Sequence, residues 1–250
     1  MGRILRADGA PAAGDHPSHY AMLDAFRRAF QNGEGPYLHR NQTIGNVIAS
    51  HIYEDLLTLG RSRKFVDEVQ GGDGVVNTRN LVTGRVGRRG DGSFGELVPG
   101  SRTIRDGSLR VPRGPIATLQ IGAEMKILAK SMIKQIDRVI NDLRNQATVF
   151  RSQSRDAIAV AVVGINCSDT YTSYERDRLY PADIPPSREA PEAIRRIDEQ
   201  VGELFDEVLF VRFKATNVAP FPFEWANVDE LRAEYGAALV RISREFDRRF

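Results

Sequence analysis

Apolar residues recur at steps of three and four along several stretches of the chain, which is the spacing of a helix that buries one face. This spacing predicts helices over 20–30, 42–59, 128–151, 190–205 and 227–249. The helix at 128–151 carries the longest apolar stripe, with its lysines and arginines outside that stripe. Gly60 follows the second helix in the position where helices commonly end.

Other stretches are typical of strands. Residues 116–127 begin with spaced apolar side chains, and 157–165 are entirely apolar and rich in β-branched residues, as in the centre of a sheet. A third strand is predicted over 207–215. The glycine-rich segment 70–115 predicts hairpins and loops with short strand-like pieces. The proline-containing segment 168–190 predicts a long polar loop.

The order of these elements predicts one α/β domain, built around a mixed sheet, over residues 21–250. Residues 1–20 are rich in Gly, Pro and Ala and are interpreted as a flexible arm. The final helix, with Arg241 and Arg244 interleaved among Ile242 and Phe246, suits either docking onto another chain or an ordinary amphipathic terminal helix. The second interpretation is the more economical one.

Composition agrees with a globular protein, at 41% hydrophobic and 27% charged residues in 250. The longest apolar run, Ala157–Ile165, is far shorter than the about 20 residues that span a bilayer as a helix. No signal-peptide core precedes it, and the single cysteine, Cys167, allows no internal disulfide. We therefore expect a cytoplasmic protein without a membrane-spanning segment. The net charge of +2 does not indicate a partner.

Positive charge is nevertheless concentrated locally. Every cation in segment 70–115 is an arginine, whose planar fork of donors suits phosphate oxygens and guanine edges. The candidate DNA-binding residues are Arg79, Arg85, Arg88, Arg89, Arg102, Arg105, Arg110 and Arg113. A solvated loop surface is the alternative interpretation.

The sequence does not support a phosphate-binding loop or a structural zinc site. Residues 90–95 (GDGSFG) fit the GxGxxG pattern of a phosphate-binding loop, but they continue into Glu-Leu-Val-Pro-Gly rather than into a helix, and no other kinase motif follows. A tight hairpin turn is the better interpretation of these glycines. With one cysteine and four scattered histidines, a structural zinc site is not expected.

The informative motif lies near the end of strand 116–127. Alternate residues of a strand share a face, so Glu124 and Lys126 point one way while Ala123 and Met125 point the other. An ordinary same-face ion pair at a sheet rim would account for the spacing alone. The strand, however, is followed by a buried amphipathic helix and an apolar strand, which gives the pair a context.

In that context the Glu-x-Lys motif resembles the PD-(D/E)xK nuclease superfamily, which includes many type II restriction endonucleases. The resemblance implies a restriction-endonuclease-like αβββαβ core, here residues 42–166, with a central mixed sheet flanked by helices and an extra C-terminal α-β-α. It covers about half of the chain by topology and rests on few motif residues.

The resemblance also implies roles for particular residues. Glu124 matches the acid that binds Mg²⁺ or Mn²⁺, and Lys126 matches the lysine that positions or deprotonates the attacking water. The first acid is left open between Asp106 and Asp91, with Asp73 a weaker choice, because no proline precedes any of them. Glu54 could add a further metal-binding acid from the first core helix, and a solvated helix position is the alternative interpretation.

These residues point to a metal-dependent endonuclease that hydrolyses phosphodiester bonds in DNA, in restriction or anti-phage defence. Two carboxylates would hold the metal, and the lysine would supply positive charge in the transition state. Cutting both strands with one site per chain would require a homodimer. The alternative is a catalytically inactive nucleic-acid- or nucleotide-binding module of the same fold. A third interpretation is a protein-interaction domain that uses the terminal helix.

Overall fold

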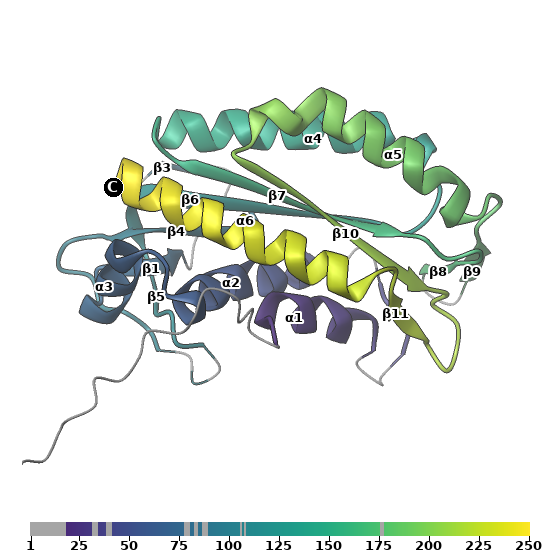
Figure 1. Ribbon diagram of the computed structural model, residues 1–250, viewed down its shortest axis with the longest axis horizontal. Helices are drawn as coiled ribbons and strands as arrows, with labels where there is room; N and C mark the ends of the chain where they lie inside the picture. The colour runs from purple at the N-terminus through teal and green to yellow at the C-terminus, as the bar shows by residue number, and fades with distance from the viewer. Residues whose placement is uncertain are drawn as a thin grey trace, which may run out of the picture.

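A seven-stranded mixed sheet forms the centre of the molecule, between two layers of helices (Figure 1). The computed structural model describes residues 19–31, 35–38, 42–77, 81–82, 85–86, 90–105, 107, 109–175 and 178–250. The strands lie in the order β11-β10-β7-β6-β4-β1-β5. The predicted α/β class, with a mixed sheet flanked by helices, is therefore confirmed.

Half of the sheet is an antiparallel meander. It consists of β1 (Gly74–Asn77), β4 (Gly92–Leu97) and β6 (Ile116–Leu128), with the short β5 (Arg113–Gly114) parallel to β1. The other half is parallel: β7 (Ile158–Asn166) lies beside β6, and β10 (Glu207–Ala215) lies beside β7. The last strand, β11 (Phe223–Trp225), pairs antiparallel with the end of β10.

Helices cover the two faces of the sheet in separate groups (Figure 1). One face packs against α4 (Met132–Gln153) and α5 (Pro186–Val201), which form one apolar cluster with alternate residues of β7. The other face packs against α1 (Ala21–Phe30), α2 (Gln42–Leu59), α3 (Arg63–Gly71) and α6 (Val228–Arg249). Burial on both faces explains why β7 is apolar from Ile158 to Ile165.

Smaller elements surround this frame. Residues Leu81–Val82 (β2) and Arg85–Val86 (β3) pair with each other, and Thr172–Glu175 (β8) forms a hairpin with Arg178–Pro181 (β9). A short 3₁₀ turn, Gly202–Leu204, follows α5.

Buried carboxylates cap two of the helices. Asp55 of α2 accepts hydrogen bonds from the first peptide groups of α1, Ala21 N at 2.7 Å and Met22 N at 2.9 Å, and from Tyr235 Oη at 2.8 Å. Glu189 of α5 accepts from Met132 N, the first residue of α4, at 2.9 Å. Each carboxylate satisfies donors that a helix N-terminus leaves unpaired and ties two helices together.

Most predicted elements are confirmed, with shifted ends. The predicted strand 207–215 coincides with β10, and 42–59 coincides with α2. Helix α4 begins at Met132 rather than 128, because β6 extends to Leu128. Helix α5 begins at Pro186, since proline is well tolerated in a first helical turn.

Two expectations were wrong, and one helix was not predicted. Segment 168–190 is not a loop, because it contains the β8–β9 hairpin and the start of α5. Helix α3 was not predicted. The glycines of 90–95 do not form a turn throughout, because β4 begins at Gly92. A Cβ at Gly95 would lie 1.8 Å from Thr118 O, so this glycine permits the close approach of β6 at a register shift.

Residues 1–18 of the predicted arm lie outside the described residues. Tyr20 is the last residue of that arm and the first of the predicted helix 20–30. Its side chain is buried, and its ring packs edge-on against Tyr235. None of the helices within the described ranges combines the length and apolar character that a membrane crossing requires.

Candidate active site

The two halves of the sheet separate at β6, the strand that carries Glu124 and Lys126. Strand β4 begins at Gly92, opposite Ala123, whereas β6 continues to Leu128 beside β7. Among the described residues, no strand of the main sheet pairs with 124–128 on the side of β4. Glu124 and Lys126 therefore lie beyond the start of β4, on a part of β6 that, among the described strands of the main sheet, pairs with β7 alone.

Asp91 lies beside this part of β6 because it directly precedes β4. Its Oδ2 accepts a hydrogen bond from Met125 N at 2.9 Å. Helix α2 packs closely over the carboxylate: a Cβ placed on Gly45 would lie 2.8 Å from Asp91 Cγ. A Cβ on the preceding Gly90 would lie 2.5 Å from Ala123 O. Glycine at both positions lets Asp91 sit directly against β6.

Glu124 is buried beside Asp91, with an exposed fraction of 9%. Burial, followed by the negative charge of Asp91, raises the pKa of Glu124 to about 7, although Lys126 and a hydrogen bond from the Asp91 main chain oppose the rise. The two carboxylates are therefore close enough to repel each other, and near neutral pH Glu124 is only partly ionised in the metal-free protein.

Lys126 lies on the same face of β6 as Glu124, as predicted from strand alternation. Its Nζ is 3.0 Å from Glu124 Oε1 and 3.6 Å from Asp142 Oδ2 on α4. Burial alone would lower the pKa of Lys126, but Glu124 and then Asp142 outweigh it and raise the pKa. The ammonium group therefore stays protonated in these surroundings.

Asp142 and Gly45 belong to this site but were not predicted. Asp142 is one of several charged residues of α4, so its position in the sequence gives no sign that it faces Lys126. Gly45 did offer a signal, because a glycine inside a helix of this length is destabilising unless close packing requires it.

The other acids are placed elsewhere or lie outside the described residues. Asp106, one of the two choices for the first acid, is not among those residues. Asp73 precedes β1, and its main-chain oxygen accepts from Leu97 N, at the end of β4 remote from Asp91. Asp91 is thus the described candidate that lies beside Glu124.

Glu54 is not brought to the pair. It is buried under segment 110–111, where its carboxylate accepts from Val111 N at 2.7 Å and from Arg110 Nε at 3.2 Å. No group of three or more Asp, Glu, His or Cys able to hold a metal occurs within the described residues. The expectation that Glu54 joins Asp91 and Glu124 in one ligand set is therefore corrected: Glu54 anchors a loop.

The predicted arginine surface is described only in part. Arg79, Arg88 and Arg89 lie outside the described residues, and of Arg85 only the main chain belongs to them. Arg102 and Arg105 are exposed. Arg110 is engaged with Glu54, and Arg113 is half-buried in β5. Two of the eight arginines thus have described, exposed side chains that do not hold the fold together through a salt bridge.

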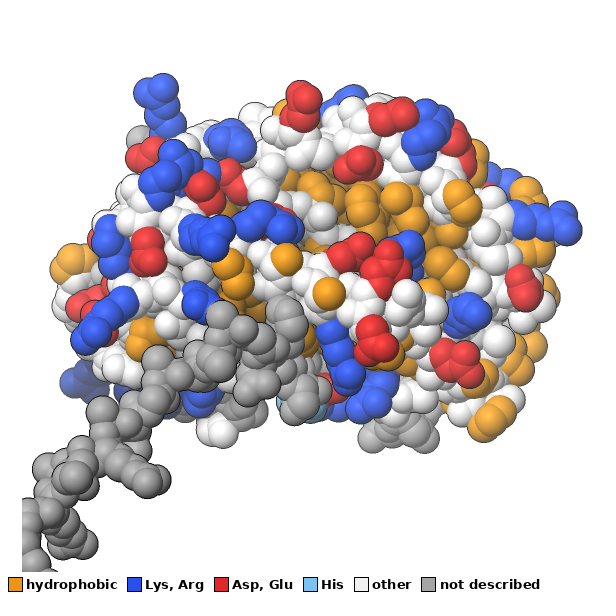
Figure 2. Space-filling view, viewed as in Figure 1, with side chains coloured by type: hydrophobic (Ala, Val, Ile, Leu, Met, Phe, Trp, Pro, Cys, Tyr) orange, Lys and Arg blue, Asp and Glu red, His pale blue; other side chains and the backbone are white. Residues whose placement is uncertain are grey.

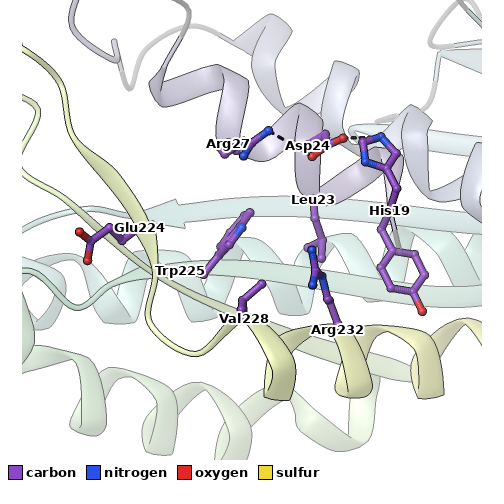
Figure 3. A pocket seen from close by; sticks show the side chains of 9 residues that line it. His19, Leu23, Asp24, Arg27, Glu224, Trp225, Val228 and Arg232 are labelled. Atoms are coloured by element: carbon purple, nitrogen blue, oxygen red, sulfur yellow. Dashed lines mark ion pairs between the residues drawn. The ribbon is translucent and has the colours of Figure 1, made fainter. Parts of the chain in front are cut away.

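A separate groove of about 400 Å³ lies between α1, β11 and α6 (Figure 3). Figure 3 shows Arg27, Asp24 and His19 side by side along α1, with Trp225 and Arg232 on the opposite side of the groove. Asp24 already pairs with His19 at 2.5 Å and with Arg27 at 3.6 Å. The groove contains none of the predicted site residues and lies on the face of the sheet away from α4.

The chemistry of Asp91 and Glu124 suits a hard divalent cation. Carboxylate oxygens are the ligands that Mg²⁺ prefers, and Mg²⁺ commonly uses one or two carboxylates together with water and phosphate oxygens. A cation between the two groups would also remove the repulsion that raises the pKa of Glu124. The residues present therefore fit a magnesium or manganese ion held by two protein carboxylates.

Comparisons with known proteins do not identify a family for this chain. No family model matches it, and searches of curated proteins and of solved structures found no match.

Proposed function

We propose that this protein is a metal-dependent DNA endonuclease of the PD-(D/E)xK type. The observation that carries the proposal is the convergence of Asp91, Glu124 and Lys126 beside the start of β4, where burial and then the charge of Asp91 raise the pKa of Glu124 to about 7. A paired carboxylate with a perturbed pKa beside a lysine is typical of catalytic sites rather than of surface ion pairs.

The order of elements supports this proposal. Apart from α3 and the short strands β2, β3 and β5, the chain runs from α2 through β1, β4, β6 and α4 to β7 in the order α-β-β-β-α-β. Strands β1, β4 and β6 are antiparallel neighbours, and α4 crosses over to the parallel β7. This order is compatible with the core that the resemblance to the nuclease superfamily implies, in which Asp91, Glu124 and Lys126 would take the first-acid, second-acid and lysine positions.

Each residue would have a distinct task. Asp91 and Glu124 would hold Mg²⁺ or Mn²⁺, which supplies neutralisation of phosphate charge and a water of lowered pKa. Lys126 would orient the attacking water and stabilise the charge that develops on the phosphate. Its raised pKa favours this role over accepting a proton, because the ammonium group stays charged. Asp142 would hold the same ammonium group from α4.

The substrate assignment rests on the exposed arginines of the glycine-rich segment. Arg102 and Arg105 would contact the phosphate backbone of DNA, and such contacts make binding strongly dependent on salt. A role in restriction or defence in the cytoplasm would follow from the nuclease activity.

The experiment is cleavage of supercoiled plasmid by purified protein with Mg²⁺ or Mn²⁺. The proposal expects cleavage that EDTA abolishes and that falls by about 100-fold or more in Glu124→Gln, Asp91→Asn and Lys126→Met, since each removes a group needed in the transition state. Asp73→Asn is the matched control and is expected to cleave like the wild type, and Asp106→Asn tests the alternative first acid.

The outcomes discriminate between the candidate functions. Metal-dependent cleavage that survives Glu124→Gln would refute the assigned site. A salt-sensitive gel shift of the plasmid without any cleavage, unchanged in the three variants, would favour the inactive nucleic-acid-binding module. Loss of activity in Asp106→Asn with full activity in Asp91→Asn would move the first acid to Asp106.

A further inference from the structure

Strand β10 has an open edge. It pairs with β7 along seven of its residues, from Glu207 to Phe213, but on its other side β11 covers only 213–215. Ala226 N donates to Arg212 O at 3.1 Å, so the peptide groups of Arg212 face this outer side. Because directions alternate along a strand, the peptide groups of Phe210 and Val208 face outward too. No described strand pairs with them.

Apolar surface lies beside this edge. The side chains of Val208 and Phe210 are only half-buried, and a groove of about 460 Å³ separates β10 from α6. Small residues line the helix side of the groove, namely Ala233, Ala237 and Ala238. Figure 2 shows hydrophobic side chains gathered in the hollow between α5 and α6.

Open strands of this kind are usually protected by central charges, by proline or by a covering segment. The open stretch 207–211 (EVLFV) has a single charged residue, Glu207, and that residue lies at one end. An unprotected apolar edge of this kind favours pairing with another strand.

Helix α6 presents an ordered row of charges along the same groove. Glu230 and Glu234 lie in its N-terminal half, where both pair with Arg212 of the same chain. Arg241 and Arg244 lie in its C-terminal half, where Arg241 pairs with Glu207. All four side chains nevertheless remain exposed. Ala237 lies midway between the two pairs. A second α6 in antiparallel orientation would therefore place acids opposite arginines at both ends and small residues at the crossing.

The middle of the open stretch of β10 lies beside the middle of α6. Arg241 Nη2 bonds Glu207 Oε2 at 2.9 Å, and Arg212 Nη2 lies 2.9 Å from Glu230 Oε1, so α6 runs antiparallel to β10. The middle of the open stretch, Leu209, consequently lines the groove together with Ala237. One axis between two copies can therefore relate both elements at once.

We propose that a second copy of this chain binds here, with β10 of each copy antiparallel to the other about a two-fold axis near Leu209 and Ala237. Val208 and Phe210 of each strand would exchange backbone hydrogen bonds with the partner's Phe210 and the partner's Val208. Glu234 and Glu230 would meet the partner's Arg241 and the partner's Arg244. The charge order of α6 favours a second copy over an unrelated strand, because a two-fold interface needs a surface that complements itself.

The first test measures oligomeric state by light scattering and sedimentation at chain concentrations up to about 100 μM, because an interface of ordinary size gives dissociation constants in roughly the micromolar range or below. The wild type is expected to be a dimer. Ala237→Glu, which places two like charges at the axis, is expected to weaken the dimer at least about 10-fold. Arg232→Gln makes the same change in net charge on another side of α6 and is expected to leave the dimer intact.

The second test separates interface effects from folding defects. Glu234→Arg and Arg241→Glu each place like charges across the axis, so each variant alone is expected to be monomeric. An equimolar mixture would have opposite charges at both contacts and is expected to form a heterodimer. A monomeric wild type, a dimer insensitive to Ala237→Glu, or a mixture that stays monomeric would each overturn the proposal. None of these measurements depends on nuclease activity.

Discussion

Replacing Glu124 by glutamine is expected to stabilise the metal-free protein at pH 8. In the folded chain burial and the charge of Asp91 raise the pKa of this carboxyl from 4.5 to about 7. A difference of about 2.5 units at roughly 1.4 kcal/mol each corresponds to about 3 kcal/mol of unfolding free energy. Glutamine has nearly the same shape without the charge, so it avoids this cost.

The sign of the pH dependence follows from proton linkage. Because the folded-state pKa of Glu124 lies above the unfolded value, the bound proton stabilises the folded chain fully below about pH 4.5, and this contribution is lost as the pH rises through 7. The unfolding free energy of the wild type relative to Glu124→Gln is therefore expected to fall by about 3 kcal/mol between pH 4.5 and pH 8. A bound divalent cation would restore that loss in the wild type alone.

The assay is urea denaturation of both proteins at several pH values, in EDTA and then in excess Mg²⁺. The exposed Glu96→Gln on β4 serves as the control and is expected to follow the wild type at every pH. A difference between wild type and Glu124→Gln that stays constant with pH, or a variant less stable at pH 8 than the wild type in EDTA, would refute the reasoning. Equal stabilisation of both proteins by Mg²⁺ would show that the cation binds elsewhere.

Three further substitutions test the packing around this site and the fold. Gly45→Ala is expected to displace the Asp91 carboxylate, which lies 2.8 Å from the new Cβ, and to weaken Mg²⁺-dependent stabilisation about 10-fold or more. Asp55→Ala is expected to cost about 3 kcal/mol in urea denaturation, because two hydrogen bonds at the start of α1 and one from Tyr235 of α6 are lost. Gly95→Ala places a Cβ 1.8 Å from Thr118 O, so a loss of at least about 3 kcal/mol in thermal unfolding is expected.

Much of this fold was predictable because periodicity reports which face of an element is buried. The stripe on 128–151 predicted α4, and the uniformly apolar 157–165 predicted a strand covered on both faces. The same argument, with a period of two, placed Glu124 and Lys126 on one face of β6, where their side chains form a pair. These features depend only on local spacing.

Features that depend on distant segments were not predictable. The side chains of β9 are exposed throughout, and the buried residue of β8 is the polar Ser173, so no apolar periodicity distinguishes the β8–β9 hairpin from the predicted loop. The position of Asp91 beside Glu124 depends on the register of β4 on β6, which shifts at Gly95 and again before Leu97. Glu54 was a plausible metal ligand only until the path of 110–111 placed Val111 N on its carboxylate.

The two proposals concern opposite sides of the parallel half of the sheet. Strand β7 separates β6, which carries the proposed active site, from β10. Across these strands Glu124 pairs with Ala161, and Ala161 pairs with Val208, next to the proposed axis. A two-fold axis perpendicular to the joined sheets would keep both Glu124 sites on the same face, about five strand spacings or roughly 25 Å apart. That separation is too large for both sites to act on one phosphate. Each copy would therefore cut a different phosphodiester bond, which is what cleavage of both strands by one site per chain requires.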